Sequence, residues 1–308
     1  MEAISVLGAR LFCSRSELKK VAWLINYGTD IPHAAHETVK AWNVSILKTA
    51  KPPAPTATSF LRYQNLHTER EFCFLQKPVE VEPDDIRIGT AATSKSFHLH
   101  CLPEDVTHFV AAIHSARKDL GILDPPLIIW EPSPPSCIES NREAILQAIK
   151  EVNVFSPNHE ELGRILGRDD AIRLEPSDIM TLAEEIAYRV STWANKKPHT
   201  CIVVRSGRLG CYIRSSMQSS WLSPYWTPSS ARVIDPTGAG NAFLGSFAIG
   251  YLRTANWIEA GKYGNIGASF VVEQNGTPPL TEGERWNGET VESRLRHYNV
   301  GLEENGRE

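Results

Sequence analysis

Short apolar runs alternate with runs of helical period along the second half of the chain. LIIW at residues 127–130 is typical of a short buried strand, and REAILQAIKEV at 142–152 follows it with a helical pattern. VFSP at 154–157 ends a second strand, and HEELGRILG at 159–167 begins a second helix. Alternating strands and helices imply parallel strands joined by right-handed helical crossovers, so the pattern predicts an α/β fold.

The apolar segments CIVV at 201–204 and VID at 233–235 continue this series, and we expect both to be strands of the same sheet. A turn rich in small or polar residues follows each of them. Ligands of open α/β sheets collect beyond the carboxyl ends of the strands. The turns after these strands are therefore the candidate binding region.

The first eighty residues follow a different pattern. SELKKVAWLINYG at 16–28 predicts an amphipathic helix capped by Ser16, and residues 58–78 predict two strands around a polar turn. A proline-rich connector, KPPAPTAT at 51–58, leads into that hairpin. At the other end, the chain from about Arg294 to residue 308 is polar enough to fray.

Composition agrees with one large domain over residues 1–308. The chain has 42% hydrophobic and 22% charged residues and a formal net charge of −4. Basic residues form no run longer than a pair, so we expect no nucleic-acid partner, and no apolar stretch is long enough to suggest a membrane span. No secretory signal is visible, and the six scattered cysteines and the pair His98 and His100 are interpreted as structural residues of a cytoplasmic protein.

The most informative segment is DPTGAGNAFLGSF at 235–247. Gly238, Ala239 and Gly240 form a small-residue turn that opens a helix at about Asn241. The first backbone N–H groups of a helix have no partner within it, and this end carries a partial positive charge, so such a turn can bind an anion. The alternative is an ordinary turn between a strand and a helix.

Four segments together resemble the ribokinase-like, or PfkB, carbohydrate kinases from about Leu7 to Pro279. They are VFSPNHEELGRIL, CIVVRSGRLGCYIR, VIDPTGAGNAF and GNIGASFVVEQNGTPP. SFHLHC at 96–101, LIIWEPSPPSC at 127–137 and Asn241 make the resemblance closest to a fungal, maintenance-of-killer-like branch. The resemblance implies a three-layer α/β/α fold with a mainly parallel sheet, and a small β lid from residues of about 56–80.

The resemblance also implies ATP-dependent transfer of a phosphoryl group to a hydroxyl of a sugar or nucleoside. Gly238, Ala239 and Gly240 would form the anion hole. Asn158 and Glu161 would hold Mg²⁺ through water, and Asp235 and Thr237 would supply oxygens to K⁺. The implied nucleotide-binding positions are Ser206, Gly207, Gly210, Asn265 and Gly276. Without the resemblance, Asn158 is equally a helix cap and residues 206–210 are equally a hairpin turn.

The sequence departs from the family at three places. Arg205 stands where Thr or Ser is usual, and Asn241 stands where the family has an Asp that acts as the base. The family's first strand, its substrate-binding Asp and a Gly-Gly turn have no counterpart, so we expect either a start codon assigned too late or a reduced sugar site and incomplete lid. In the second case the hairpin at 58–77 is a candidate homodimer contact.

A neutral amide at residue 241 has no useful basicity, so three hypotheses follow. The first is a weak or atypical sugar or nucleoside kinase. The second is a pseudokinase that binds nucleotide and has a regulatory role. The third is a non-kinase enzyme of a fungal biosynthetic pathway that reuses the cleft.

Overall fold

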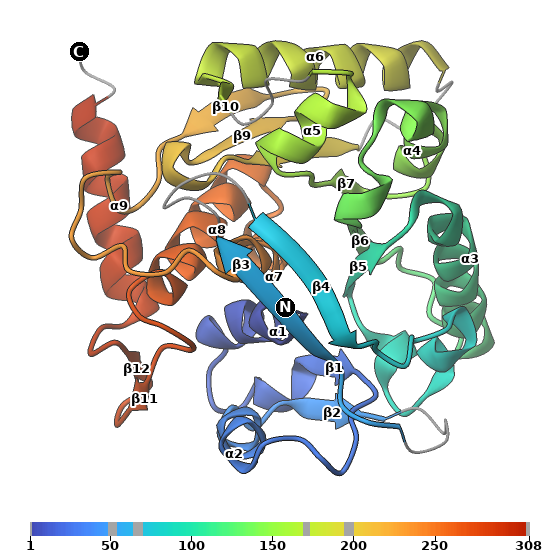
Figure 1. Ribbon diagram of the computed structural model, residues 1–308, viewed down its shortest axis with the longest axis vertical. Helices are drawn as coiled ribbons and strands as arrows, with labels where there is room; N and C mark the ends of the chain where they lie inside the picture. The colour runs from blue at the N-terminus through green and yellow to red at the C-terminus, as the bar shows by residue number, and fades with distance from the viewer. Residues whose placement is uncertain (1, 49–53, 64–69, 169–172, 194–199, 306–308) are drawn as a thin grey trace. The chain divides into compact units, whose positions relative to one another are not determined.

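The computed structural model describes residues 2–48, 54–63, 70–168, 173–193 and 200–305 (Figure 1). By its internal contacts the chain divides into two compact units, and one domain over residues 1–308 stays a prediction. The larger contains residues 1–13, 95–110 and 125–308, and the smaller contains residues 14–94 and 111–124. Helix α3 (Pro103–Asp119) runs from the first unit into the second.

A six-stranded sheet is the centre of the larger unit, with strand order β10-β9-β8-β7-β6-β5. β5, β6, β7 and β8 are parallel, while β9 is antiparallel to both of its neighbours. The mainly parallel α/β fold is therefore confirmed. The strands are β5 (Ser96–Cys101), β6 (Leu127–Pro132), β7 (Val154–Phe155), β8 (Cys201–Arg205), β9 (Cys211–Arg214) and β10 (Ser219–Leu222).

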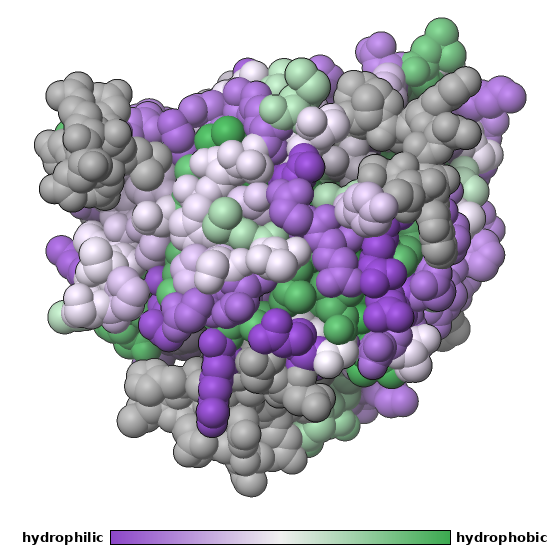
Figure 2. Space-filling model, turned by 90° about the horizontal axis from the view of Figure 1, so that it is seen from above, coloured by the Kyte–Doolittle hydropathy of each residue, from purple (hydrophilic) through white to green (hydrophobic). Residues whose placement is uncertain are grey.

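Helices pack on both faces of this sheet. Side chains alternate along a strand, so Ile129 and Val203 face α7 (Ala239–Thr254) and α8 (Trp257–Val271), where they share a buried cluster with Phe247. On the other face, the Tyr212 hydroxyl donates to Glu184 of α6. The helices of that layer are α4 (Arg142–Ile149), α5 (His159–Ile165) and α6 (Pro176–Trp193). Seen from the α6 side, hydrophilic residues occupy much of the surface (Figure 2).

Helix α1 (Glu2–Leu11) packs against α7 at very short range. A Cβ on Gly245 would lie 1.8 Å from the Ser5 carbonyl oxygen, and one on Gly8 would lie 2.2 Å from the Ala242 carbonyl oxygen. Only glycine allows this approach of two backbones. This close packing of α1 against α7 fixes the start of α7, on which Asn241 lies.

The smaller unit contains two separate two-stranded sheets. β1 (Ala22–Leu24) pairs in parallel with β2 (Ser45–Leu47), and β3 (Thr58–Tyr63) pairs antiparallel with β4 (Arg70–Gln76) as predicted. The helix predicted for residues 16–28 is wrong. That segment forms a single 3-10 turn, η1 (Leu18–Lys20), and then β1, because pairing with β2 replaces the helical hydrogen bonds. The remaining elements are α2 (His33–Ala41), η2 (Pro83–Arg87) and η3 (Ala91–Thr93).

Three other expectations differ from the structure. Residues 233–235 form no strand, although the backbone N–H groups of Ile234 and Asp235 both donate to the Val272 carbonyl. Cys73 is exposed, which differs from the structural role interpreted for the cysteines, although all six are thiols. The tail predicted to fray is the helix α9 (Val291–Asn305) up to residue 305. Short elements complete the larger unit: η4 (Pro134–Ser136), η5 (Glu139–Asn141), η7 (Gly207–Leu209), β11 (Leu280–Thr281) and β12 (Arg285–Trp286).

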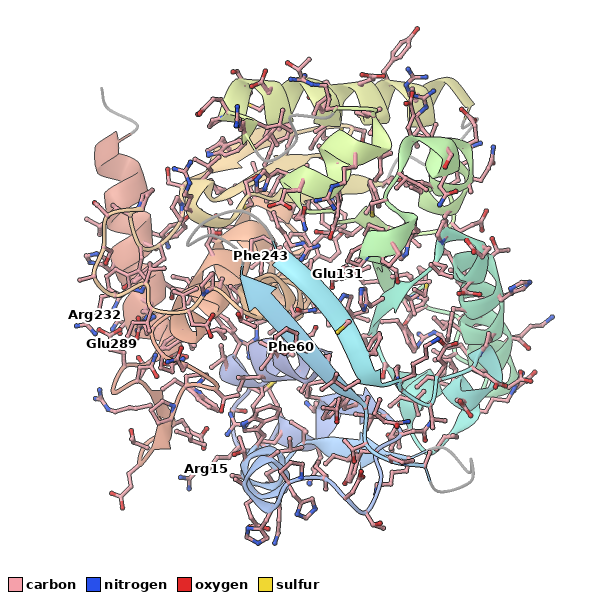
Figure 3. All side chains as sticks on the ribbon, in the orientation of Figure 1. Arg15, Phe60, Glu131, Arg232, Phe243 and Glu289 are labelled. Carbon is pink, nitrogen blue, oxygen red and sulfur yellow. The ribbon has the colours of Figure 1, made fainter. Side chains whose placement is uncertain are left out.

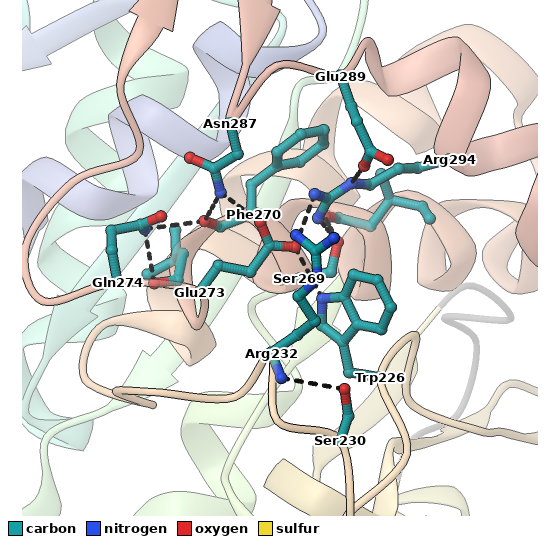
Figure 4. Close-up of polar contacts among 12 residues, drawn as sticks. Trp226, Ser230, Arg232, Ser269, Phe270, Glu273, Gln274, Asn287, Glu289 and Arg294 are labelled. Carbon is teal, nitrogen blue, oxygen red and sulfur yellow. Dashed lines mark hydrogen bonds and ion pairs between the residues drawn. The ribbon is translucent and has the colours of Figure 1, made fainter.

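Arg294 explains why α9 is ordered (Figure 4). Its side chain is 1% exposed and forms ion pairs of 2.6 Å with Glu273, which is 5% exposed, and with Glu289. Glu273 also accepts hydrogen bonds from the Trp226 indole and the Asn287 amide. The fully paired charges attach α9 to the segment that follows α8. No helix in the described part of the chain is long and apolar enough to cross a membrane.

Candidate active site

Polar side chains gather where the parallel strands end. Glu131 lies near the carboxyl end of β6 (Figure 3), Ser156 follows β7, and Arg205 ends β8. Asn158 pairs with Arg205 in a parallel bridge, and the Arg205 backbone N–H donates to the Pro157 carbonyl at 3.1 Å. Register thus brings residues from three separate segments to one edge of the sheet, the position where α/β folds bind ligands.

The small-residue turn begins α7 as predicted. Gly238 is the residue before the helix and has a φ of +84°, a conformation that favours glycine. Upstream, the Thr237 N–H donates to the Asp235 carboxylate at 2.9 Å, which fixes the approach to the turn. The Asp235 carboxylate is therefore engaged within its own turn. The helix supplies the positive end that the anion-binding prediction requires.

Arg205 lies directly against this turn. A Cβ on Gly240 would be 2.5 Å from Arg205 Nη1. The same Nη1 pairs with Glu131 Oε1 at 2.7 Å, and Nη2 donates to the Ser156 carbonyl at 3.0 Å and lies 3.6 Å from Glu161 Oε2. A buried guanidinium thus connects the turn to two buried carboxylates.

Asn241 belongs to a chain of hydrogen bonds that ends on α1. Its Nδ2 donates to Glu131 Oε2 at 3.3 Å, and His98 Nε2 lies 3.0 Å from the same oxygen. His98 Nδ1 lies 2.8 Å from the Ser5 hydroxyl. A carboxylate is therefore present beside Asn241, but it comes from β6 and not from the α7 position where the family has its Asp.

The two carboxylates have opposite pKa shifts because the Arg205 guanidinium lies 2.7 Å from Glu131 but 3.6 Å from Glu161. Burial by itself would raise the pKa of Glu131, but the charge of Arg205 and the hydrogen bond with His98 outweigh burial and lower it. Burial raises the pKa of Glu161 to about 7, and the more distant Arg205 offsets this only in part. Glu131 is the ionised partner of Arg205, and a carboxylate held at low pKa is a poor proton acceptor near neutral pH.

This difference predicts a pH effect on stability in metal-free protein. Between about 4.5 and 7 the folded state binds more protons at Glu161 than the unfolded state does, so the free energy of unfolding should fall as pH rises through that range. Glu161→Gln should remove this decrease in the free energy of unfolding, which across the range amounts to on the order of 1–3 kcal/mol. Urea titrations of both proteins across this range, in EDTA, measure the difference. Parallel curves would contradict the assigned pKa.

Asn158 and Glu161 do not fit Mg²⁺ in the arrangement seen here. The Asn158 carbonyl oxygen accepts from the Glu161 N–H, and Glu161 Oε2 accepts from the Asn158 N–H, both at 2.8 Å, in a reciprocal helix cap. The Glu161 side chain is 6% exposed, so water-mediated ligation lacks access, and the neighbouring charge is already a guanidinium. A magnesium ion would need the cap to open.

The predicted nucleotide-facing residues lie in three places of the same unit. Gly207 and Gly210 have φ values of +52° and +96°, and a Cβ on Gly210 would lie 2.0 Å from the Leu222 carbonyl oxygen, so the hairpin itself requires glycine there. Ser206 is buried, and within the described residues its hydroxyl has no hydrogen-bond partner.

The remaining two positions differ in their surroundings. The Asn265 amide donates to the Ser223 carbonyl at 2.9 Å and lies 2.8 Å from the Tyr298 hydroxyl, which connects α8 to the chain after β10 and to α9. Gly276 has a φ of +86° and open space around it. Binding of nucleotide by these residues stays a prediction.

Sequence reasoning missed Glu131 as a member of the site and interpreted His98 as structural. One signal was available for Glu131. A carboxylate at the end of the apolar strand LIIWEP must be paired if the strand is buried, and strand ends are where ligands collect. The unusual Arg205 is the matching cation, two strands away in the sheet.

Comparison with known proteins agrees with this fold. The model of the pfkB family of carbohydrate kinases matches residues 54–282, and the chain belongs to that family. It is 26% identical over 310 residues to Protein MAK32 of Saccharomyces cerevisiae, with 96% of this chain and 83% of that protein covered. The fungal resemblance is therefore confirmed.

Solved structures give the same fold. Ribokinase from Giardia lamblia aligns with a TM-score of 0.66 at 17% identity, covering 98% of this chain and 87% of that one. Fructokinase from Vibrio cholerae, solved with fructose, ADP and calcium ion bound, aligns with a TM-score of 0.61 at 17% identity, covering 96% and 89%. The ribokinase-like fold class is confirmed.

Proposed function

We propose that this protein binds the phosphates of ATP or ADP on the turn from Gly238 to Gly240 and transfers a phosphoryl group slowly to a hydroxyl of a small molecule. The observation that carries the proposal is the α7 turn, with Gly238 in a left-handed conformation at the positive end of a 16-residue helix. The fructokinase with bound ADP supports a nucleotide as the anion.

The slow rate follows from Asn241. Phosphoryl transfer depends mostly on positioning and charge stabilisation, and a general base typically contributes 10²–10⁴-fold. Asn241 cannot accept the proton, and Glu131 beside it is held ionised by Arg205. The site therefore retains the anion-binding turn without an effective base at residue 241 or at the neighbouring residue 131.

A nucleotide-binding regulatory protein, or pseudokinase, is the second candidate. It is favoured by Asn241 in place of the family's Asp, together with the Arg205 guanidinium that lies against Gly240. Mg²⁺ at Asn158 and Glu161 would require their reciprocal cap to open, whereas K⁺ at Asp235 and Thr237 stays a prediction of the kinase hypothesis. Failure of any nucleotide to bind would leave the third candidate, a non-kinase enzyme.

We also propose an oligomeric state and a cellular location for the protein. Phe60, Phe74 and Leu75 of the β3–β4 hairpin are 43%, 47% and 69% exposed, which supports a homodimer through this hairpin. Six cysteine thiols support a reducing, cytoplasmic location.

Gly240→Val tests whether the turn binds nucleotide. The new side chain would meet Arg205 and cover the first turn of α7, so affinity for ADP should fall at least about tenfold, equivalent to 1.4 kcal/mol. Gly301→Val in α9 is the matched control, because nothing lies within 4 Å of its Cβ position. Isothermal titration calorimetry compares the three proteins. Equal affinity for ADP in wild type and Gly240→Val would remove the turn from the binding site.

A further inference from the structure

Arg205 is placed where a cation would ordinarily be unfavourable. The N-terminal end of α7 already carries a partial positive charge, and the guanidinium lies against its second residue, Gly240. Glu131 offsets this charge at 2.7 Å, while Glu161 lies further away at 3.6 Å. Two positive groups that converge on one turn form a site for a strongly charged anion.

Donors on two consecutive residues support this interpretation. The Arg205 side chain is 10% exposed, and its buried Nε has no hydrogen-bond partner within the described chain; the same holds for the Ser206 hydroxyl. A buried donor without a partner is unfavourable, so a fold that retains two of them at its candidate binding edge is suited to a ligand that accepts hydrogen bonds.

The guanidinium also lies where a divalent ion would be needed. Asn158 and Glu161 hold each other in a helix cap, and the positive group beside Glu161 is Arg205. A second cation at this position would be repelled by the first and would enter a buried site without a free carboxylate. A guanidinium can neutralise phosphate oxygens itself, through charge-assisted and often paired hydrogen bonds.

We infer that Arg205 replaces the divalent metal ion in this chain, so that nucleotide phosphates bind at the α7 turn without Mg²⁺. Arginine has five N–H donors, and Glu131 and Ser156 each engage one nitrogen atom of the guanidinium. The inference rests on the proposed binding of nucleotide at this turn. It adds that the cation is part of the chain and that affinity is independent of metal.

The test measures ATP and ADP affinity by calorimetry in EDTA and in excess MgCl₂. Wild type should bind equally well in both conditions. Arg205→Ser, which restores a residue usual in the family, should lose at least about tenfold in EDTA and regain affinity with Mg²⁺, because Glu131 and Glu161 then lack their cation. Arg208→Ser is the matched control, since it removes the same charge from an exposed position on the same turn.

The wild-type comparison needs no substitution, so it holds even if Arg205→Ser fails to fold. A second variant, Arg205→Met with Glu131→Gln, removes the charge without leaving Glu131 ionised and should also lose affinity in EDTA. Binding to wild type only with Mg²⁺, or unchanged binding to a folded Arg205 variant in EDTA, would overturn the inference and leave the proposed function intact. Absence of nucleotide binding in both conditions would overturn the proposed function and the inference together.

Discussion

The double variant Glu131→Gln with Asn241→Asp should transfer phosphoryl groups about 10²–10⁴-fold faster than wild type to a suitable hydroxyl acceptor. The exchange moves one negative charge from residue 131 to residue 241 and leaves the net charge of the cluster unchanged. The amide introduced at residue 131 can still accept from Arg205 and can donate to His98 and to the new carboxylate at residue 241, so the hydrogen-bond positions are kept with reversed polarity. Radiolabel transfer from ATP measures the rate.

Asn241→Asp alone is the informative control. It places two carboxylates within about 3.3 Å of each other, and such a pair cannot easily be ionised at both groups. We expect a smaller gain than in the double variant, together with lower stability. A single variant as fast as the double variant would contradict the role of Glu131 as the counter-charge that replaces the Asp.

Arg294→Ala should lower the free energy of unfolding by about 3–5 kcal/mol, the typical effect of removing one partner from a buried ion pair. The substitution leaves the Glu273 carboxylate buried without its guanidinium and removes the contact of that guanidinium with the Phe270 ring, 3.7 Å from the ring centre. Urea denaturation followed by tryptophan fluorescence measures the change.

Arg296→Ala is the control, because Arg296 lies on the same helix and is exposed. Its effect should stay within about 0.5 kcal/mol. Arg294→Ala should also weaken nucleotide binding, since Val272, next to Glu273, holds the backbone of Ile234 and Asp235 before the α7 turn. Equal stability of the two variants would show that the buried ion pair does not hold α9 in place.

The parts of the fold that the sequence predicted are those whose signal is local. Apolar runs ending at Phe155 and at Arg205, and the hairpin between β8 and β9, are determined by the periodicity of their own residues. The ordered helix α9 could not be predicted from local periodicity. Arg294 is polar in sequence and becomes buried only by pairing with Glu273, 21 residues earlier. β1 similarly depends on its pairing with β2, more than twenty residues downstream.

The candidate site also contains local motifs, which the sequence predicts, and contacts between distant residues, which it does not. The turn at Gly238 and Gly240 is a local motif that the sequence identified. The cap formed by Asn158 and Glu161 is also local, and the sequence offered it only as the alternative to Mg²⁺ binding. The link between Glu131 and Arg205 joins strands that are separated by β7 in the sheet. A single sequence shows the unusual charges of Glu131 and Arg205 separately, and only the register of the sheet brings them together.

We expect the protein to retain a phosphate-binding turn but to lack an effective base at residue 241. The turnover rate of the wild-type protein tests this expectation most directly. Radiolabel transfer from ATP should be measured over a panel of sugars, polyols and nucleosides, with Gly240→Val as the blank. We predict transfer above this blank at a rate about 10²–10⁴-fold below the 1–100 s⁻¹ typical of kinases. Turnover of wild type at those ordinary rates, with Asn241 in place, would contradict the account.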